Sequence, residues 1–253
     1  MVFKVDAACG SFIGNGRSNN EDNFYFNRKH LPERNKGLKN PIKYSGSTAD
    51  IVMFAVFDGM GGEASGEVAS FVSAEAMVKG AEQMKKYLLS PRPFFEQLCA
   101  DMNRAVCEES SKLKFGRMGS TVASILFWGD MAYACNIGDS RIYRSRDNEL
   151  LQISVDHVES LPPNSKHKAG LMQFLGMPED EIRLEPSISK GELKKDDKFL
   201  ICSDGITDML SNIEICAIVK EHQSVKRIAE ALIEQALKNG GKDNITAIVC
   251  KVR

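Results

Sequence analysis

Five short motifs that carry carboxylates recur along the chain, each in or beside a glycine turn that follows an apolar run. They occupy residues 17–22, 58–62, 138–141, 203–205 and 242–244. Aspartate is poor in strands and costly to bury unless it is paired or bound to a cation. A single Asp-Gly pair is also an ordinary turn. Five such motifs in one chain predict that carboxylates gather at one rim of a strand-rich fold, around hard metal ions.

The bulk properties exclude several classes of protein. The 253 residues fit one large domain or two small ones, and 43% hydrophobic with 26% charged residues is typical of a soluble globular chain. The formal net charge of −1 provides no basic field for nucleic acid or anionic lipid. No run approaches the roughly 20 apolar residues that span a bilayer, and residues 1–10 lack a signal-peptide pattern. We therefore expect a cytoplasmic protein that binds neither nucleic acid nor membrane.

The cysteines and histidines do not form a metal-binding or disulfide pattern. The seven cysteines are odd in number and show no Cys-x-x-Cys spacing. Four of them lie in or beside apolar runs, where a reduced cysteine behaves as a small hydrophobe: Cys9, Cys135, Cys202 and Cys250. The four histidines lie in polar stretches: His30, His157, His167 and His222. A zinc site and a disulfide framework are therefore disfavoured.

Strand-like and helix-like segments come in blocks rather than in alternation. Hydrophobic periodicity predicts strands at residues 2–9, 51–57, 120–127, 131–137, 141–145, 198–202 and 244–252. It predicts helices at residues 64–89, 91–113, 213–219 and 225–237. Residues 27–50 read as a long exposed connection and residues 157–170 as a loop or small flap. The blocks favour an α+β layered fold over a parallel doubly wound sheet, and the lack of a linker predicts one domain over residues 1–253.

The residue types in the five motifs favour an oxygen-ligated site. Asp58 and Asp204 each follow an apolar strand where a glycine permits a sharp turn, and Gly59 offers its carbonyl oxygen. Mg²⁺ and Mn²⁺ prefer such oxygen ligands, and several Asp residues together fit a two-metal site that clamps a phosphoryl group. Arg17 is suited to bind phosphate because guanidinium matches two phosphate oxygens at once. No catalytic Cys or Ser motif is present, which favours direct attack by metal-bound hydroxide.

The five motifs, in this order, resemble those of the metal-dependent Ser/Thr protein phosphatases of the PP2C type, in their compact bacterial form. The resemblance runs from residue 14 to residue 246. Further family elements lie between the motifs, at residues 118–121, 136–141, 156–157 and 175–176. It implies a four-layer α-β-β-α sandwich with two central antiparallel sheets and a binuclear metal site at one edge.

The resemblance also implies a role for each metal-site residue. Asp58 would bridge two ions of Mg²⁺ or Mn²⁺, and Asp204 and Asp243 would complete the first site. The carbonyl of Gly59 and, through water, Glu21 would serve the second. An Asp that merely forms a turn, or a Glu that is a solvated loop charge, is the ordinary alternative for these positions.

Other residues match the family less directly. Arg17 matches its phosphate-binding arginine, and Asp22 is expected to orient ligands and waters at the catalytic site. Asp139 matches the acid that helps to hold a third, weaker metal ion in bacterial members. Thr121 and Asn244 would support the ligands or simply satisfy backbone groups. A surface salt bridge for Arg17 and a plain hairpin turn for Asp139 are the alternatives.

Four departures from the family pattern stand out. Met60 occupies the place where animal members carry a histidine proposed as general acid, and Glu63 stands where many bacterial members have a histidine. The flap, at about residues 157–175, is short, which leaves substrate choice and the third metal ion open. Residues 27–50 form a long connection with two basic clusters, either a protein-docking surface or a solvated hairpin.

We therefore expect a protein-serine/threonine phosphatase that hydrolyses phosphoserine and phosphothreonine monoesters. Two alternatives remain: a two-metal phosphoesterase for small phosphate esters, diesters or nucleotides, and a catalytically inactive phosphatase-like binding module. The branch that acts on sigma-factor regulators generally lacks the Arg-x-x-Asn-Glu-Asp element of residues 17–22. Phosphorylated proteins are the expected partners, with an opposing Ser/Thr kinase, and we expect a monomer, although the sequence does not separate it from a weak dimer.

Overall fold

Two antiparallel sheets form the centre of the molecule. The computed structural model describes residues 1–61, 65–84, 90–112, 118–162, 169–178 and 182–253. In spatial order, the first sheet consists of β3 (Ile42–Ser47), β1 (Lys4–Phe12), β12 (Ile245–Val252), β11 (Lys198–Cys202), β8 (Arg141–Arg146) and β9 (Glu149–Gln152). The second consists of β10 (Ser187–Glu192), β7 (Met131–Ile137), β6 (Val122–Trp128), β4 (Val52–Gly61) and β2 (Asp22–Phe26), and β5 (Met118–Ser120) pairs with the end of β4.

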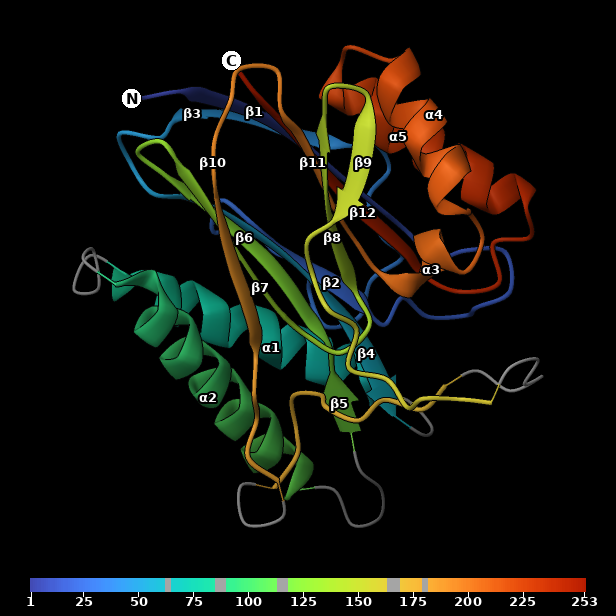
Figure 1. Cartoon of the computed structure of the whole chain (residues 1–253). Helices are drawn as coiled ribbons and strands as arrows, with labels where there is room; N and C mark the ends of the chain where they lie inside the picture. The colour runs from blue at the N-terminus through green and yellow to red at the C-terminus, as the bar shows by residue number, and fades with distance from the viewer. Residues whose placement is uncertain (62–64, 85–89, 113–117, 163–168, 179–181) are drawn as a thin grey trace.

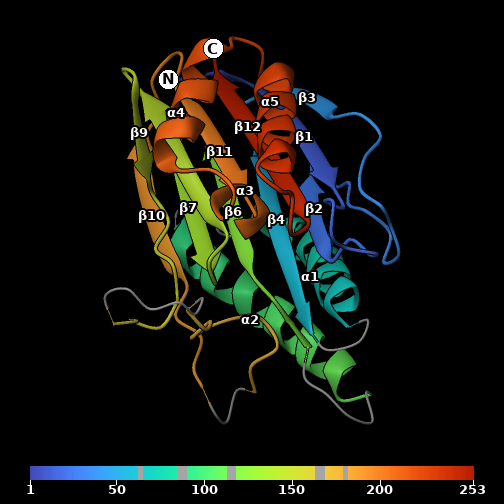
Figure 2. The ribbon, with the colours of Figure 1, turned by 90° about the vertical axis from the view of Figure 1, so that its right-hand side faces the viewer.

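Helices cover the outer face of each sheet, which produces four layers. Helices α1 (Gly66–Ala81) and α2 (Pro91–Ser110) pack on the second sheet, whereas α4 (Asn212–Glu221) and α5 (Val225–Lys238) pack on the first. Figures 1 and 2 show these two helix pairs on opposite sides of the paired sheets. A short helix, α3 (Asp204–Thr207), follows β11 directly. The predicted α-β-β-α sandwich is confirmed.

Burial on both faces explains the unbroken apolar runs in the sequence. Along β12, Ile248 and Cys250 face the second sheet, whereas Ala247 and Val249 face the α4–α5 layer. Alternate residues of a strand point to opposite faces, so a strand covered on both sides is apolar at nearly every position. The same argument applies to β4, which is buried from Val52 to Phe57.

The helices on the first sheet follow from local signals. Helix α4 begins with a capping box, in which Ser211 accepts a hydrogen bond from the backbone of Glu214 and Glu214 accepts one from the backbone of Ser211. Helix α5 buries Ile228, Leu232 and Ala236, which lie on one face at helical spacing. Among the described residues, no helix is long and apolar enough to cross a membrane.

The structure corrects the expected element boundaries at several places. The connection 27–50 was expected to be exposed throughout, but Ile42–Ser47 forms the edge strand β3, which pairs with β1. Residues 120–127 are not one strand, because β5 and β6 pair with different parts of β4 on either side of Thr121. Strands β2, β9 and β10 and helix α3 lie outside the predicted elements. Most of these strands are short or half exposed, so their apolar signal is weak.

Candidate metal and phosphate site

Except for Asp22 and Asn244, the predicted site residues line one cavity of about 320 Å³. They are Arg17, Glu21, Asp58, Gly59, Asp139, Asp204 and Asp243. Met60, Thr121, Ala169 and Leu171 complete most of the remaining wall. The structure therefore brings together residues from all five carboxylate motifs, as the sequence predicts.

Both sheets contribute to this cavity. The second sheet brings Asp58, near the end of β4, and the first sheet brings Asp204, which follows β11, and Asp243, which lies just before β12. Since β11 and β12 are antiparallel neighbours, the end of one and the start of the other meet at the same edge. Packing the two sheets face to face then places this edge beside the end of β4.

The buried side chain of Asn244 holds the first motif against the last. Its Oδ1 accepts a hydrogen bond from the backbone of Glu21 at 2.7 Å, and its Nδ2 donates to the carbonyls of Ile13 at 2.8 Å and Asn19 at 2.9 Å. The backbone of Gly59 donates to the Glu21 carbonyl at 3.1 Å. Asn244 thus satisfies backbone groups, and in doing so it fixes Glu21 beside Asp243 and Gly59.

Asp22 lies beneath the cavity rather than in its wall. It pairs in register with Asp58 across β2 and β4, and only 1% of its surface is exposed. The hydroxyl of Ser203 donates to Asp22 Oδ2 at 2.7 Å, next to Asp204. Burial raises the pKa of Asp22 to about 7, although hydrogen bonds with Ser203 and Thr246 oppose the rise. Asp22 is therefore placed to orient the Ser203–Asp204 turn, and it does not reach the cavity itself.

The carboxylates of the cavity repel one another. Burial raises the pKa of Asp58 well above its usual range, and the charges of Asp204, Asp22 and Asp139 and a hydrogen bond with Asp204 raise it further. Like charges this close favour a shared proton over full ionisation. A bound cation would remove this repulsion by neutralising the carboxylates directly.

Arg17 is bound to one of the predicted metal ligands. Its Nη2 lies 2.6 Å from Asp243 Oδ2, with side chains that are 45% and 35% exposed. This hydrogen bond is the main cause of the raised pKa of Arg17. The arginine therefore sits at the rim of the cavity, within reach of both the carboxylates and an incoming anion.

The residues of the cavity fit hard divalent cations by the chemistry of their donors. None of the residues that line it is His or Cys, and its carboxylates and the Gly59 carbonyl are the oxygen ligands that Mg²⁺ and Mn²⁺ prefer. In the part of the chain that the structure describes, no three His, Cys, Asp or Glu side chains stand as a preformed ligand set. Two contacts already involve these carboxylates: Arg17 bonds to Asp243, and Asp58 is hydrogen bonded to Asp204.

The chain matches a known protein family over most of its length. The model of the family described as "Protein phosphatase 2C" matches residues 42–248. The chain belongs to the protein phosphatase 2C family. The sequence prediction of the family is thereby confirmed, and the four-layer sandwich is the fold of solved members.

Bacterial phosphatases are among the proteins most similar to this phosphatase 2C chain. The serine/threonine protein phosphatase PstP of Mycobacterium tuberculosis is 30% identical over 238 residues, which is 88% of this chain and 45% of PstP. This chain thus spans less than half the length of that relative. The serine/threonine phosphatase stp of Listeria welshimeri is 28% identical over 209 residues, covering 77% of this chain and 82% of stp.

Solved phosphatase structures superpose over almost the whole chain. The S. agalactiae serine/threonine phosphatase gives a TM-score of 0.80 at 25% identity, covering 98% of this chain and 100% of that one. The catalytic domain of PstP in complex with two manganese ions gives a TM-score of 0.76 at 28% identity, covering 100% and 99%.

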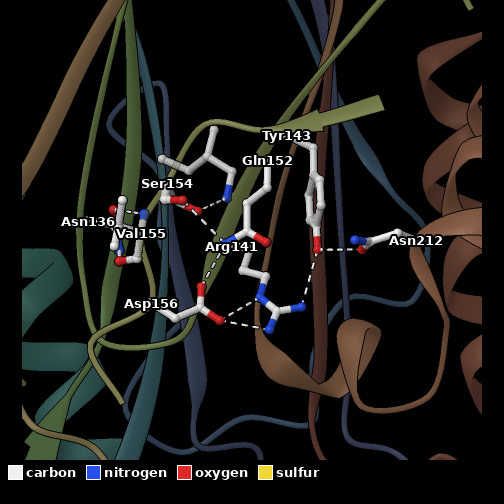
Figure 3. A network of polar contacts seen from close by, with 9 residues as sticks. Asn136, Arg141, Tyr143, Gln152, Ser154, Val155, Asp156 and Asn212 are labelled. Atoms are coloured by element: carbon white, nitrogen blue, oxygen red, sulfur yellow. Dashed lines mark hydrogen bonds and ion pairs between the residues drawn. The ribbon is translucent and has the colours of Figure 1, made fainter. Parts of the chain in front are cut away.

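In this phosphatase 2C chain, the turn that carries Asp139 is held by a polar network. Figure 3 shows Arg141 facing Asp156, with Arg141 Nε 2.8 Å and Nη2 2.7 Å from Asp156 Oδ2. Gln152 donates to the other oxygen of Asp156 at 2.8 Å, and Tyr143 connects Arg141 to Asn212 at the start of α4. The pair is half buried, with side chains that are 30% and 16% exposed. It joins β8 to the segment that enters the flap.

His157 and Thr121 also hold the same turn. The Gly138 amide donates to His157 Nδ1 at 3.1 Å, while the His157 amide donates to the Gly138 carbonyl at 3.0 Å. The hydroxyls of Thr121 and Ser140 lie 2.7 Å apart, and Thr121 Oγ1 accepts from the Asp58 amide at 3.0 Å. Thr121 therefore links the Asp58 and Asp139 motifs, which is a structural role. His157 likewise contacts backbone, and burial lowers its pKa.

The flap approaches the cavity through its C-terminal part. Val158 and Leu171 form an isolated bridge, and the amide of Glu159 donates to the carbonyl of Gly170 at 2.9 Å. Ala169 and Leu171 line the cavity. Residues 163–168 of the flap, and Glu63, lie outside the described residues. Met60, the residue at the place of the animal histidine, also lines the cavity and carries no transferable proton.

The sequence analysis missed several residues that support the site. Ser203 precedes Asp204, and its hydroxyl donates to Asp22. Ser140 follows Asp139 and bonds to Thr121. Thr246 donates its backbone amide to the Ser203 hydroxyl and its own hydroxyl to Ser11. The Arg141–Asp156 pair joins residues 15 positions apart. Ser140, Arg141, Ser203 and Asp156 lie within the motifs and family elements of the sequence, but their place in a motif does not identify the partner of each side chain.

Proposed function

We propose that the chain is a metal-dependent protein-serine/threonine phosphatase that hydrolyses phosphoserine and phosphothreonine monoesters. The observation that supports this best is the cavity in which Asp58, Asp204 and Asp243 converge with Arg17 at the rim. The names of PstP and stp describe the same activity in relatives that share the fold. Because the chain spans 45% of PstP, we extend the activity to it as a proposal.

We propose a task for each group of residues in the cavity. Asp58, Asp204 and Asp243 would hold one divalent cation, and the Gly59 carbonyl and, through water, Glu21 would hold the second with Asp58. When bound, this pair of Mg²⁺ or Mn²⁺ ions supplies an activated water and neutralises phosphoryl charge. Asp139, with Asp204, is our candidate for a third, weaker cation site.

Arg17 binds the substrate in this proposal. Its guanidinium releases Asp243 and donates two parallel hydrogen bonds to the phosphoryl oxygens, which orients the phosphorus for attack. The same charge stabilises the oxygens as negative charge is redistributed in the transition state. Met60 provides no proton, so the leaving serine or threonine oxygen takes its proton from water or from another group.

The proposal includes partners and a location. Substrates are phosphorylated proteins, and a Ser/Thr kinase is the opposing enzyme. The cytoplasm is the proposed compartment because none of the seven cysteines is in a disulfide in the structure, and a reducing compartment keeps them reduced. The chain is proposed to act as a monomer and as one domain over residues 1–253.

Hydrolysis assays test the proposal against its alternatives. Purified protein with Mn²⁺ is expected to release phosphate from a phosphothreonine peptide, and much more slowly from a phosphodiester. Preference for the diester would favour a different two-metal phosphoesterase. Two manganese ions bound in calorimetry with no hydrolysis of any ester would favour an inactive binding module.

A further inference from the structure

Glu67 is a buried carboxylate whose Oε2 has no hydrogen-bond partner in the structure. It lies in the first turn of α1, and 5% of its surface is exposed. Over the described residues, only one other buried side-chain atom, Arg144 Nε, is in the same situation. Leaving a charged oxygen buried without a partner is costly, so this atom calls for a physical explanation.

The start of α1 is pressed against the Glu21 side of the cavity. A Cβ atom on Gly66 would lie 2.8 Å from Glu21 Cδ and 2.9 Å from the Gly59 carbonyl oxygen. The glycine therefore allows the helix to approach two of the proposed cation ligands at once. Glu67 is the next residue, and its charge acts on Glu21, where it adds to burial in raising the pKa of that carboxyl.

Three oxygen groups thus gather where α1 begins: the Glu21 carboxylate, the Gly59 carbonyl and the unpartnered oxygen of Glu67. Glu67 is not among the residues that line the cavity, but the approach of Gly66 to Glu21 and the charge interaction between Glu67 and Glu21 place it next to that side. Mg²⁺ and Mn²⁺ usually keep several waters, and these waters need acceptors around the ion. Mutating a residue that supports a metal site from outside the direct ligands typically costs about 10–100-fold in metal affinity or activity.

We propose that Glu67 belongs to the divalent-cation site on the Glu21–Gly59 side, where it accepts hydrogen bonds from water bound to the cation. The inference rests on the proposed function and assigns a further positioning residue to it. A cation there offsets the repulsion between Glu67 and Glu21. It also provides, through its water, the partner that Glu67 Oε2 lacks.

A different explanation exists for an acidic residue at this position. A carboxylate in the first turn of a helix is stabilised by the helix dipole, here in α1. The two explanations predict opposite effects on the metal-free protein. If the dipole explains Glu67, removing its charge destabilises the metal-free protein; if the cation explains it, removing the charge relieves repulsion from Glu21.

Calorimetric titration with MnCl₂ and thermal unfolding of Glu67→Gln test the proposal. We expect affinity at one manganese site to fall about tenfold or more, with the metal-free Tm unchanged or higher. Glu75→Gln, on the same helix and with the same change of charge, is the control and should leave both quantities unchanged. Glu67→Asp, which keeps the charge but shortens the side chain, should lower the affinity less than Glu67→Gln.

The outcomes separate this inference from the proposed function. Two manganese ions bound with equal affinity by the parent chain and by Glu67→Gln would overturn the role of Glu67 and leave the phosphatase proposal intact. A lower metal-free Tm, or failure to fold, in Glu67→Gln would also overturn it, in favour of the helix dipole. If the parent chain bound no manganese, the proposed function itself would fail.

Discussion

Asp58 is buried among other carboxylates at the end of β4. Burial and the charges of Asp204, Asp22 and Asp139 all raise its pKa, so the ionised form is unfavourable in the metal-free protein. A buried carboxylate that lowers the stability of the folded protein and lines a cavity is typical of a functional site. Such a residue is kept for its function although it lowers the stability of the fold.

Asp58→Asn should abolish phosphatase activity without unfolding the protein. Asparagine keeps the shape of the side chain but lacks the charge that holds cations, and it removes repulsion from Asp204. We therefore expect turnover below detection with a phosphothreonine peptide, and a metal-free Tm equal to or above that of the parent. A folded variant with near-normal turnover would contradict the placement of the metal site at β4.

Arg17→Lys tests the phosphate-binding role of this single residue. An ammonium group is a point charge and does not form the two parallel bonds of a guanidinium. Losing one charge-assisted hydrogen bond costs roughly 1.5–3 kcal/mol, so kcat/KM should fall at least about tenfold. Arg17→Ala should lower it further, yet manganese affinity should rise or stay constant, because Asp243 no longer has to exchange the arginine. Reduced manganese affinity in Arg17→Ala would contradict this assignment.

At the scale of the elements, the Asp139 turn depends on contacts from two separate segments. Asp156 bonds to Arg141, His157 bonds to the Gly138 backbone, and Thr121 bonds to Ser140. The segment that enters the flap therefore holds the turn between β7 and β8.

Asp156→Asn should destabilise the protein by about 1–2 kcal/mol, because the half-buried Arg141 loses its charged partner. The control is Glu234→Gln, which breaks an exposed pair with Arg227 and should have little or no measurable effect. Urea unfolding of the metal-free variants measures both. Equal effects of the two substitutions would show that the Arg141–Asp156 pair contributes no more than a surface ion pair.

At the scale of the whole molecule, the proposed cation site lies between the two sheets. Asp58 comes from the second sheet, whereas Asp204 and Asp243 lie beside β11 and β12 of the first. A ligand that binds across the two sheets favours their packed arrangement, because it binds the folded state and has no comparable site in the unfolded chain.

Manganese should therefore stabilise the fold by mass action. At a concentration one hundred times its dissociation constant, a single site adds about 2.7 kcal/mol to the free energy of unfolding. We expect MnCl₂ to raise the Tm, EDTA to reverse the rise, and Asp204→Asn to abolish most of it. The control is buffer without MnCl₂ in which NaCl gives the same ionic strength. A Tm that does not respond to manganese would argue against cation binding between the sheets.

The sequence by itself determined the family, the α+β class and the residues of the cavity, because these depend on local signals: apolar runs, glycine turns and carboxylates in a fixed order. Its short and half-exposed elements, such as β3 and β10, carry too little apolar signal to be predicted and form through pairing with neighbours. Only the tertiary structure decided that Asp22 lies beneath the cavity, that Arg17 holds Asp243, and that Glu67 Oε2 is buried without a partner. The physical reason is that burial and partnership depend on which sheet faces, strand ends and helix starts come together, and these contacts join residues far apart in the chain.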